Sequence, residues 1–172
     1  MYPGGNVIRV TPTLDTDAIS ADNVVLFDAT EIPNAVASRG GVSKIIGLTI
    51  LNEDDVQHDI DLVFMQVQTN LGTQNSAVGS GSLWTNALAK AAKVLGVIKI
   101  DWDDQSNDLI NNLVYTHVSK GTSVGQPLPF MLQAEGGSTS VYVAGISRNG
   151  NTQSVQTAAD DYEFIFHVEY IS

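Results

Sequence analysis

Carboxylates are the residues of this chain best suited to chemistry, and they occur in short runs. Residues 51–66, LNEDDVQHDIDLVFMQ, place five acidic residues and a histidine between Asn52 and Asp61. A second run, DWDDQSND, occupies residues 101–108. Carboxylate oxygens are ligands that calcium prefers, and paired carboxylates also act as general acids and bases. The loops 52–61 and 101–108 are therefore candidate calcium or catalytic sites.

Neither run has the spacing of an EF-hand calcium loop, which needs glycine at its sixth position and glutamate at its twelfth. Counts that start at Asn52 or at either aspartate of NEDD place no glycine sixth. A count from Asp101 places serine sixth and asparagine twelfth. Calcium also binds loops without a fixed motif. A calcium site therefore stays open on three side chains of the second run, namely Asp101, Asp103 and Asp108.

The alternation of apolar and acidic residues after residue 58 predicts a strand, because successive side chains of a strand point to opposite faces. Ile60, Leu62 and Phe64 share one face, and Asp59 and Asp61 share the other. The preceding NEDD then forms the polar turn of a hairpin. In this interpretation the acidic run is the solvent-facing side of a strand. We accordingly predict no metal site, no cofactor site and no catalytic residue.

Other catalytic motifs are missing from the sequence. The chain contains no cysteine, and His58, His117 and His167 are widely spaced. The segment GISRNG has asparagine where the Gly-x-Ser-x-Gly nucleophile motif needs its second glycine. We therefore predict that the protein is not an enzyme. Arg39 and Arg148 lie in glycine-containing turns, where each planar guanidinium is a candidate contact to a neighbouring chain.

The charge of the chain limits its partners. Its 19 acidic residues against 8 basic residues give a net charge of −11. Nucleic acids require clustered lysine and arginine, and anionic membrane surfaces attract basic segments. No apolar run reaches the roughly 18 residues that indicate a membrane span. We therefore predict neither a nucleic acid partner nor a membrane partner.

Apolar residues recur with a period of two along most of the chain, which predicts strands. The clearest strand lies in DYEFIFHVEYIS, residues 161–172, and is half-buried; one of its faces holds Tyr162, Phe164, Phe166, Val168 and Tyr170. The segments 43–51 and 138–147 have apolar residues on both parities, which predicts strands buried on both faces. Further strands are predicted at 6–10, 23–27, 59–66, 97–101, 112–118 and 128–134.

About nine short strands separated by glycine-rich turns are typical of an all-β fold. We predict an antiparallel β-sandwich, jelly-roll-like, in a single domain of residues 1–172 with a short N-terminal arm at about 1–12. One segment departs from this pattern. SLWTNALAKAAKVLG, residues 82–96, is rich in helix formers and places leucines and alanines at helical spacing. It predicts one short helix, about 83–95, inserted between strands.

Three stretches of the sequence resemble a family of small virion structural proteins encoded by tailed phages. They are VVLFDATEIPNAVASRGGVSKIIGLTILNEDD (24–55), DIDLVFMQVQTNLGTQNSAV (59–78) and GQPLPFMLQAEGGSTSVYVAGISRNGNTQ (125–153). The resemblance covers about two thirds of the chain, and residues 82–120 match less clearly. It implies a non-enzymatic protein of the virus particle, made in the host cytoplasm and located on the capsid exterior.

The role that this resemblance favours is a capsid decoration, or cement, protein that binds the major capsid protein lattice. A homotrimer suits a local threefold axis of such a lattice, and the N-terminal arm with Tyr2 is a candidate attachment element. One alternative is a tail or baseplate component. Another is a calcium-dependent module that binds carbohydrate on a host surface. That module would use loops 52–61 and 101–108, with Trp84 and Trp102 as exposed aromatic residues.

Overall fold

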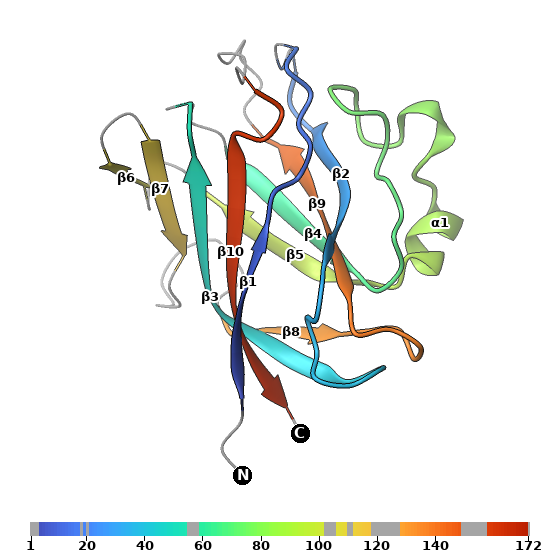
Figure 1. Cartoon of the computed structure of the whole chain (residues 1–172). Coiled ribbons are helices and arrows are strands. Elements are labelled where there is room, and N and C mark those ends of the chain that lie inside the picture. The colour runs from blue at the N-terminus through green and yellow to red at the C-terminus, as the bar shows by residue number, and fades with distance from the viewer. Residues whose placement is uncertain are drawn as a thin grey trace.

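The computed structural model describes residues 4–17, 19, 21–54, 59–101, 106–109, 112–117, 128–148 and 158–171, with backbone alone at 106–109 and 112–117. Within these residues the chain forms two antiparallel β-sheets that pack face to face (Figure 1). The prediction of an all-β sandwich is confirmed. The strands are β1 Gly5–Val10, β2 Val24–Ile32, β3 Val42–Asn52, β4 Ile60–Met65, β5 Val94–Ile100, β6 Ser106–Leu109, β7 Asn112–His117, β8 Phe130–Gln133, β9 Val141–Ser147 and β10 Tyr162–Ile171.

The strand order identifies the type of sandwich. The first sheet runs β1-β10-β3-β7-β6, with β8 pairing to another part of β3, and the second sheet runs β2-β9-β4-β5. Strands thus pair inwards from both ends of the chain: β1 with β10, β2 with β9, β3 with β8 and β4 with β5. This pairing is that of a rolled-up hairpin, which is the jelly-roll topology. The β6–β7 hairpin adds to the edge of β3.

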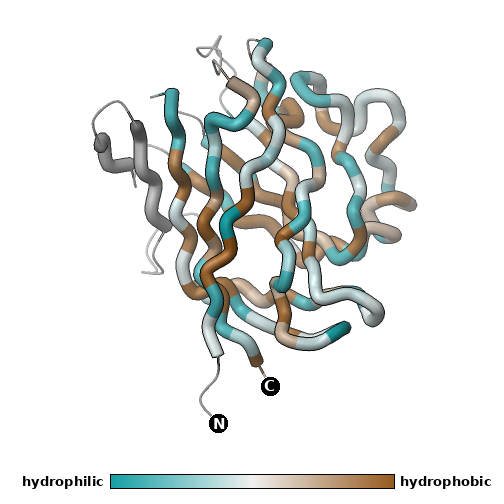
Figure 2. The backbone as a smooth tube through the Cα atoms, in the orientation of Figure 1, coloured by the Kyte–Doolittle hydropathy of each residue, from teal (hydrophilic) through white to brown (hydrophobic). Residues whose placement is uncertain are grey.

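Large apolar side chains fill the space between the sheets, because each strand turns alternate residues inwards. Phe164 and Phe166 of β10 are fully buried, as its sequence pattern predicts. Phe27 and Phe64 meet them from the second sheet, with ring centroids 5.3 Å apart for Phe27–Phe164 and 6.0 Å for Phe64–Phe166. Figure 2 shows the matching alternation of hydrophobic and hydrophilic residues along the strands. Burial of each ring stabilises the fold by about 2–3 kcal/mol.

The outer side of the second sheet is also buried, because residues 66–93 pass across it. We call these residues the cover segment; it contains the only α-helix of the described residues (Figure 1). Leu71 and Ala92 of the cover segment pack in one cluster with Val25 and Val63 of the sheet. All six residues of β4 are consequently buried. The prediction that this strand has a solvent-facing side is therefore wrong.

β3 departs from its prediction in the other direction. The apolar residues on both parities of 43–51 predict burial on both faces, but β3 is fully buried only on its inner face, and Ile46 is 47 % exposed. Ile46 is the extra residue of a β-bulge, because His167 pairs with Gly47 and Val168 pairs with Ile45. The same sequence pattern thus occurs in a covered strand and in a strand whose outward apolar residues remain exposed.

The inserted helix is present but shorter than 83–95. Helix α1 spans Asn86–Ala91 and follows a 3-10 turn at Ser80–Ser82. Thr85 caps it, since its Oγ1 accepts the Leu88 N–H at 3.3 Å. Lys93 then adopts a left-handed φ of 52°, which ends the helical path, and β5 takes up the remaining predicted residues by pairing with β4. No helix among the described residues is long and apolar enough to cross a membrane.

Most of the predicted N-terminal arm is a strand. β1 pairs along its whole length with β10, from Gly5 opposite Glu169 to Val10 opposite Phe164. The two strands also share a side-chain contact, in which the amide of Asn6 donates to the Tyr170 hydroxyl at 3.0 Å. Residues 5–10 are therefore fixed in the first sheet and are not a free attachment arm. Residues 1–3, which include Tyr2, lie outside the described residues.

Candidate functional site

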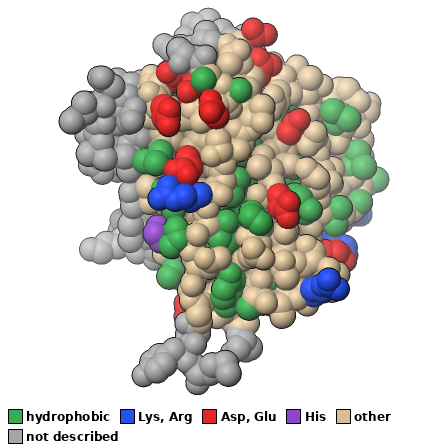
Figure 3. All heavy atoms as spheres, in the orientation of Figure 1, with side chains coloured by type: hydrophobic (Ala, Val, Ile, Leu, Met, Phe, Trp, Pro, Cys, Tyr) green, Lys and Arg blue, Asp and Glu red, His purple; other side chains and the backbone are tan. Residues whose placement is uncertain are grey.

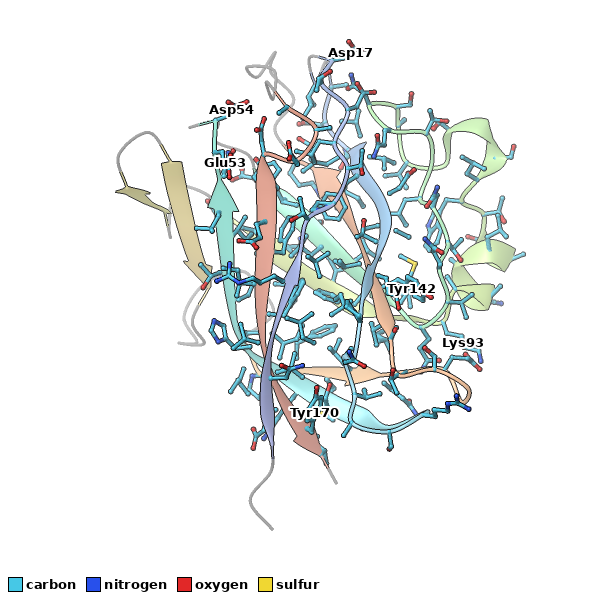
Figure 4. The ribbon with its side chains drawn as sticks, in the orientation of Figure 1. Asp17, Glu53, Asp54, Lys93, Tyr142 and Tyr170 are labelled. Atoms are coloured by element: carbon cyan, nitrogen blue, oxygen red, sulfur yellow. The ribbon has the colours of Figure 1, made fainter. Side chains whose placement is uncertain are left out.

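Acidic residues gather at one end of the sandwich, which we call the loop end. The β1–β2, β3–β4 and β9–β10 connections and the residue after β5 lie there, because neighbouring strands run in opposite directions. Figure 4 shows Asp17, Glu53 and Asp54 at this end. Its nine described acids are Asp15, Asp17 and Asp22, Glu53, Asp54 and Asp59, then Asp101, Asp160 and Asp161.

Asp161 is the most buried of the described carboxylates at the loop end, with 5 % exposed. Burial raises its pKa above the ordinary value, and the hydrogen bond and charge of Asp54 and the charge of Asp160 raise it further. The Ala158 N–H, which donates to Asp161 Oδ2 at 2.7 Å, lowers the pKa and opposes these effects. The charged form of Asp161 is therefore held in an unfavourable environment at neutral pH.

We expect the substitution Asp161→Asn to raise the free energy of unfolding at about pH 7 by about 0.5 kcal/mol or more, since it removes a repelling charge. Because the folded-state pKa is raised, the wild-type carboxyl binds its proton more readily in the folded state. Its unfavourable contribution is absent at low pH and grows as pH rises through that pKa. The gain should therefore be smaller at about pH 4 than at about pH 7, because the carboxyl takes up its proton as pH falls.

Urea unfolding of both proteins at the two pH values measures this difference. Asp22→Asn is the matched control, because it removes the same charge from an exposed turn of the loop end. A gain for Asp161→Asn that is equal at both pH values would contradict the electrostatic explanation.

The described part of the loop end does not form a metal site. Among the described residues, no group of three or more histidines or acids is placed to hold a metal ion. Of the remaining acids in 52–61 and 101–108, three lie outside the described residues, namely Asp55, Asp103 and Asp104, and Asp108 is described by its backbone alone. Calcium binding by these two loops therefore stays a prediction.

Asp61 does not face solvent, contrary to the prediction from its parity; only 3 % of it is exposed. It lies beneath Arg148, whose Nε donates to Asp61 Oδ2 at 2.7 Å. Arg148 Nη2 donates to the same oxygen, and Arg148 Nη1 donates to Asn23 Oδ1. The Arg148 side chain thus neutralises a buried carboxylate of its own chain. This role within the chain does not require a contact with a neighbouring chain.

The aromatic and imidazole side chains singled out from the sequence do not come together in the described residues. Trp84 packs against the cluster under the cover segment and is only partly exposed, so it is a poor platform for a sugar ring. His167 points outwards from β10. His117 is described by its backbone alone, and His58 and Trp102 lie outside the described residues.

The outward residues of β1, β10, β3 and β8 form a surface that we call the outer face. In Figure 3, which shows this surface obliquely, hydrophobic side chains spread over the middle of the visible side and acidic ones gather towards the loop end. Its strongly exposed large apolar residues are Val7 (54 %), Ile46 (47 %), Met131 (51 %) and Ile171 (42 %). The sequence does place apolar residues at the outward positions of these strands. The same pattern, however, is equally consistent with a strand face that is buried under another segment.

Strand register brings the apolar residues of the outer face near one another. Val7 lies opposite His167, and His167 lies opposite Gly47, the neighbour of Ile46. Met131 is opposite Lys44, which precedes Ile46 by two positions and therefore points to the same side. The four strands thus present one continuous, partly apolar sheet surface.

The outer face is electrically neutral, although the chain carries −11. Its charged side chains form two ion pairs, Arg9–Glu163 at 2.7 Å and Lys44–Glu169 at 2.9 Å, so that two bases balance two acids. Exposed pairs of this kind contribute only about 0–1 kcal/mol to stability. Their main consequence is a surface on which charge cancels, in contrast to the loop end.

A second apolar surface, the cover surface, lies on the opposite side of the sandwich. Its exposed residues are Val67 (37 %), Leu83 (42 %), Leu88 (37 %) and Val94 (40 %). Leu83 and Leu88 border an open hollow of about 450 Å³, whose remaining walls are polar: Gln68, Thr69, Asn70 and Ser82. All strongly exposed large hydrophobic residues of the described chain lie on either the outer face or the cover surface.

Comparisons of the chain with protein family models, with curated proteins and with solved structures gave no match. The functional argument therefore rests on the two apolar surfaces and the acidic loop end, together with the sequence resemblance.

Proposed function

We propose that the protein is a non-enzymatic structural protein of a virus particle, a head decoration protein that binds the major capsid protein lattice and stabilises the shell as a homotrimer. The resemblance of 24–55, 59–78 and 125–153 to tailed-phage virion proteins supports this proposal. The jelly-roll topology supports it as well, because viral capsid domains often use this fold. A fold alone does not carry a function, so the surfaces must carry the argument.

The observation that carries the proposal is the presence of two exposed apolar surfaces on opposite sides of one sandwich. A soluble protein that acts alone seldom exposes large apolar patches, whereas an assembly subunit must bury such patches on its partners. A decoration protein needs two contacts, one with neighbouring copies and one with the shell. The presence of the outer face and the cover surface on opposite sides of the same sandwich supports this role.

The acidic loop end fits a surface that stays in solvent. Nine described acids lie there, and a concentration of negative charge repels other particles and nucleic acid. Neither contact of the proposed assembly needs this end. In the proposed arrangement the loop end therefore remains exposed on the particle.

Electron cryomicroscopy of the virus particle tests the proposal directly. We expect density for a small β-sandwich on the outside of the head shell, at local threefold axes. Density confined to the tail or baseplate would contradict the head role and favour the tail alternative. A particle that lacks this chain altogether would overturn the virion assignment.

The cover surface is the proposed contact with the shell, and substitution tests this. We expect the double substitution Leu83→Lys/Leu88→Lys to weaken binding to undecorated heads by about tenfold or more, because two charges replace buried apolar side chains. Co-sedimentation of the protein with such heads measures the affinity. Thr13→Lys/Ala21→Lys is the matched control, since it adds the same charge at exposed positions of the β1–β2 connection. Equal loss in both variants would attribute the effect to charge alone and remove the cover surface from the proposal.

A further inference from the structure

We infer that the outer face is the surface through which copies of this chain contact one another. The inference rests on the proposed function, because it assigns the outer face to one of the two contacts of a decoration protein, the contact with neighbouring copies. It adds the identity of the partner, a second copy of the chain, and the residues at the contact. Those residues are the exposed apolar group of the outer face, Val7, Ile46, Met131 and Ile171.

Charge favours the outer face over the loop end as the place where two copies meet. Two chains that each carry −11 repel when they approach, most strongly where acids are concentrated. The loop end, with its nine described acids, is therefore the least suitable place for self-contact. The outer face has no net charge, because Arg9 and Lys44 balance Glu163 and Glu169. Two copies can meet there without bringing like charges together.

The relief of the outer face also suits close packing. Gly5 and Gly47 occupy outward positions of β1 and β3, and Gly5 is exposed. The His167 ring lies close to Gly47, since a β-carbon there would stand 3.3 Å from His167 Cδ2. Ile46 and Met131 are 47 % and 51 % exposed and project from the same face. Exposed apolar side chains that project from a sheet can interdigitate with those of a neighbour.

The ion pairs at this surface retain bonding capacity for a partner. Arg9 uses Nη1 on Glu163 Oε2, and its other guanidinium N–H groups make no bond within the described residues. The Arg9 side chain is 58 % exposed. A carboxylate or carbonyl of the second copy can accept these N–H groups when the faces come together. The contact therefore combines an apolar centre with charged groups that can pair across it.

The absence of cysteine from the sequence allows a direct test by thiol footprinting. Single-cysteine variants at Ile46 and Met131 place one thiol each on the outer face, and a variant at Leu83 places one thiol on the cover surface as the control. We expect a maleimide reagent to label the outer-face thiols at least about tenfold more slowly than the Leu83 thiol when the protein is assembled in solution. Dilution to the monomer should remove the difference.

Light scattering of purified protein supplies the second measurement. Wild type should have a mass that is a multiple of the 18.3 kDa chain. Ile46→Lys/Met131→Lys should shift it to the monomer, whereas Leu83→Lys/Leu88→Lys should leave the mass unchanged. Val7→Lys, on an edge strand, is the back-up if the double variant does not fold, with the thermal midpoint as the check. A dimer and a trimer both agree with the inference, since they differ only in whether the face meets itself or another part of the neighbour.

Three outcomes would overturn the inference: a monomeric wild type at every soluble concentration, an oligomer that survives the outer-face substitutions, or equal labelling of all three thiols. If the outer-face variants are monomeric but still cover heads at full occupancy, the face contacts copies in solution and the shell contact is separate. If wild type assembles through this face yet never binds heads, the proposed function fails while the inference stands. If outer-face substitutions abolish head binding of a protein that is monomeric in solution, the capsid protein is the partner and the inference fails.

Discussion

Gly145→Ala should destabilise the fold by about 3 kcal/mol, among the largest effects of any single methyl group in the described chain. Gly145 is an inward-facing position of β9, and a β-carbon there would stand 2.2 Å from Phe27 Cε1. Phe27 is fully buried and packs 5.3 Å from Phe164, so its ring cannot move aside without disturbing the aromatic core. Urea denaturation should show a lower midpoint with an unchanged slope.

Gly136→Ala is the matched control for this prediction. No heavy atom lies within 4 Å of the β-carbon position at Gly136, which lies in the turn between β8 and β9. The substitution should leave stability unchanged or raise it by up to about 1 kcal/mol through the unfolded state. A double-mutant cycle with Phe27→Leu locates the clash: the cost of Gly145→Ala should fall when the ring is absent. A cost that is the same in both backgrounds would contradict the proposed contact.

Arg148→Ala should cost about 2–3 kcal/mol, because it leaves the buried Asp61 carboxylate without its partner. The Asp61 side chain is only 5 % exposed, whereas the Arg148 side chain is 40 % exposed, so the loss arises from the acid and not from the base. Two of the three guanidinium nitrogens donate to Asp61 Oδ2. The effect should be read as a fall in the free energy of unfolding from urea titration at neutral pH.

Arg9→Ala is the control for Arg148→Ala, since it removes an arginine from an ion pair whose acid is more exposed than Asp61. The side chains of Arg9 and Glu163 are 58 % and 28 % exposed, and the expected cost is within about 1 kcal/mol. The double variant Asp61→Ala/Arg148→Ala should recover part of the loss, because no unpaired charge then remains buried. If Arg148→Ala costs no more than Arg9→Ala, the buried pair is not the cause.

Local sequence pattern was sufficient to locate the strands. β10 falls within the predicted strand segment 161–172, because large apolar residues recur there at every second position and few other structures suit that period. The other predicted strands each overlap an observed strand, although β2 runs on to Ile32 beyond the predicted 23–27, and the short strand β6 was missed. β6 reads SNDL and lacks the apolar alternation from which strands are recognised.

The length of the helix was harder to predict. At its C-terminal end, the helix propensity of the residues competes with their pairing to a neighbouring strand. Leu95 continues the apolar stripe of 83–95, and a helix is the better local choice for it. Pairing of β5 with β4 completes the second sheet and overrides that preference. The left-handed conformation of Lys93 marks the point where the chain changes from one structure to the other.

The candidate site depends on features that no single segment carries. Asp59 and Asp61 share one parity, yet Asp61 is buried under Arg148. The partner is 87 residues away in the sequence, and only the pairing of β4 with β9 brings it near. The acidic runs were visible in the sequence, but their convergence at one end follows from the order of strands in the jelly roll.

The sequence by itself determined the β-sandwich, the acidity of the chain and which apolar residues share a face of each strand. The tertiary structure alone decided which apolar faces are covered. The cover segment lies across the second sheet and buries the outward side of β4, while the outward side of β3 keeps Ile46 exposed. The physical reason is that side-chain parity fixes only which residues share a face of a strand. Whether that face meets another segment, solvent or a second chain depends on contacts between residues far apart in the sequence.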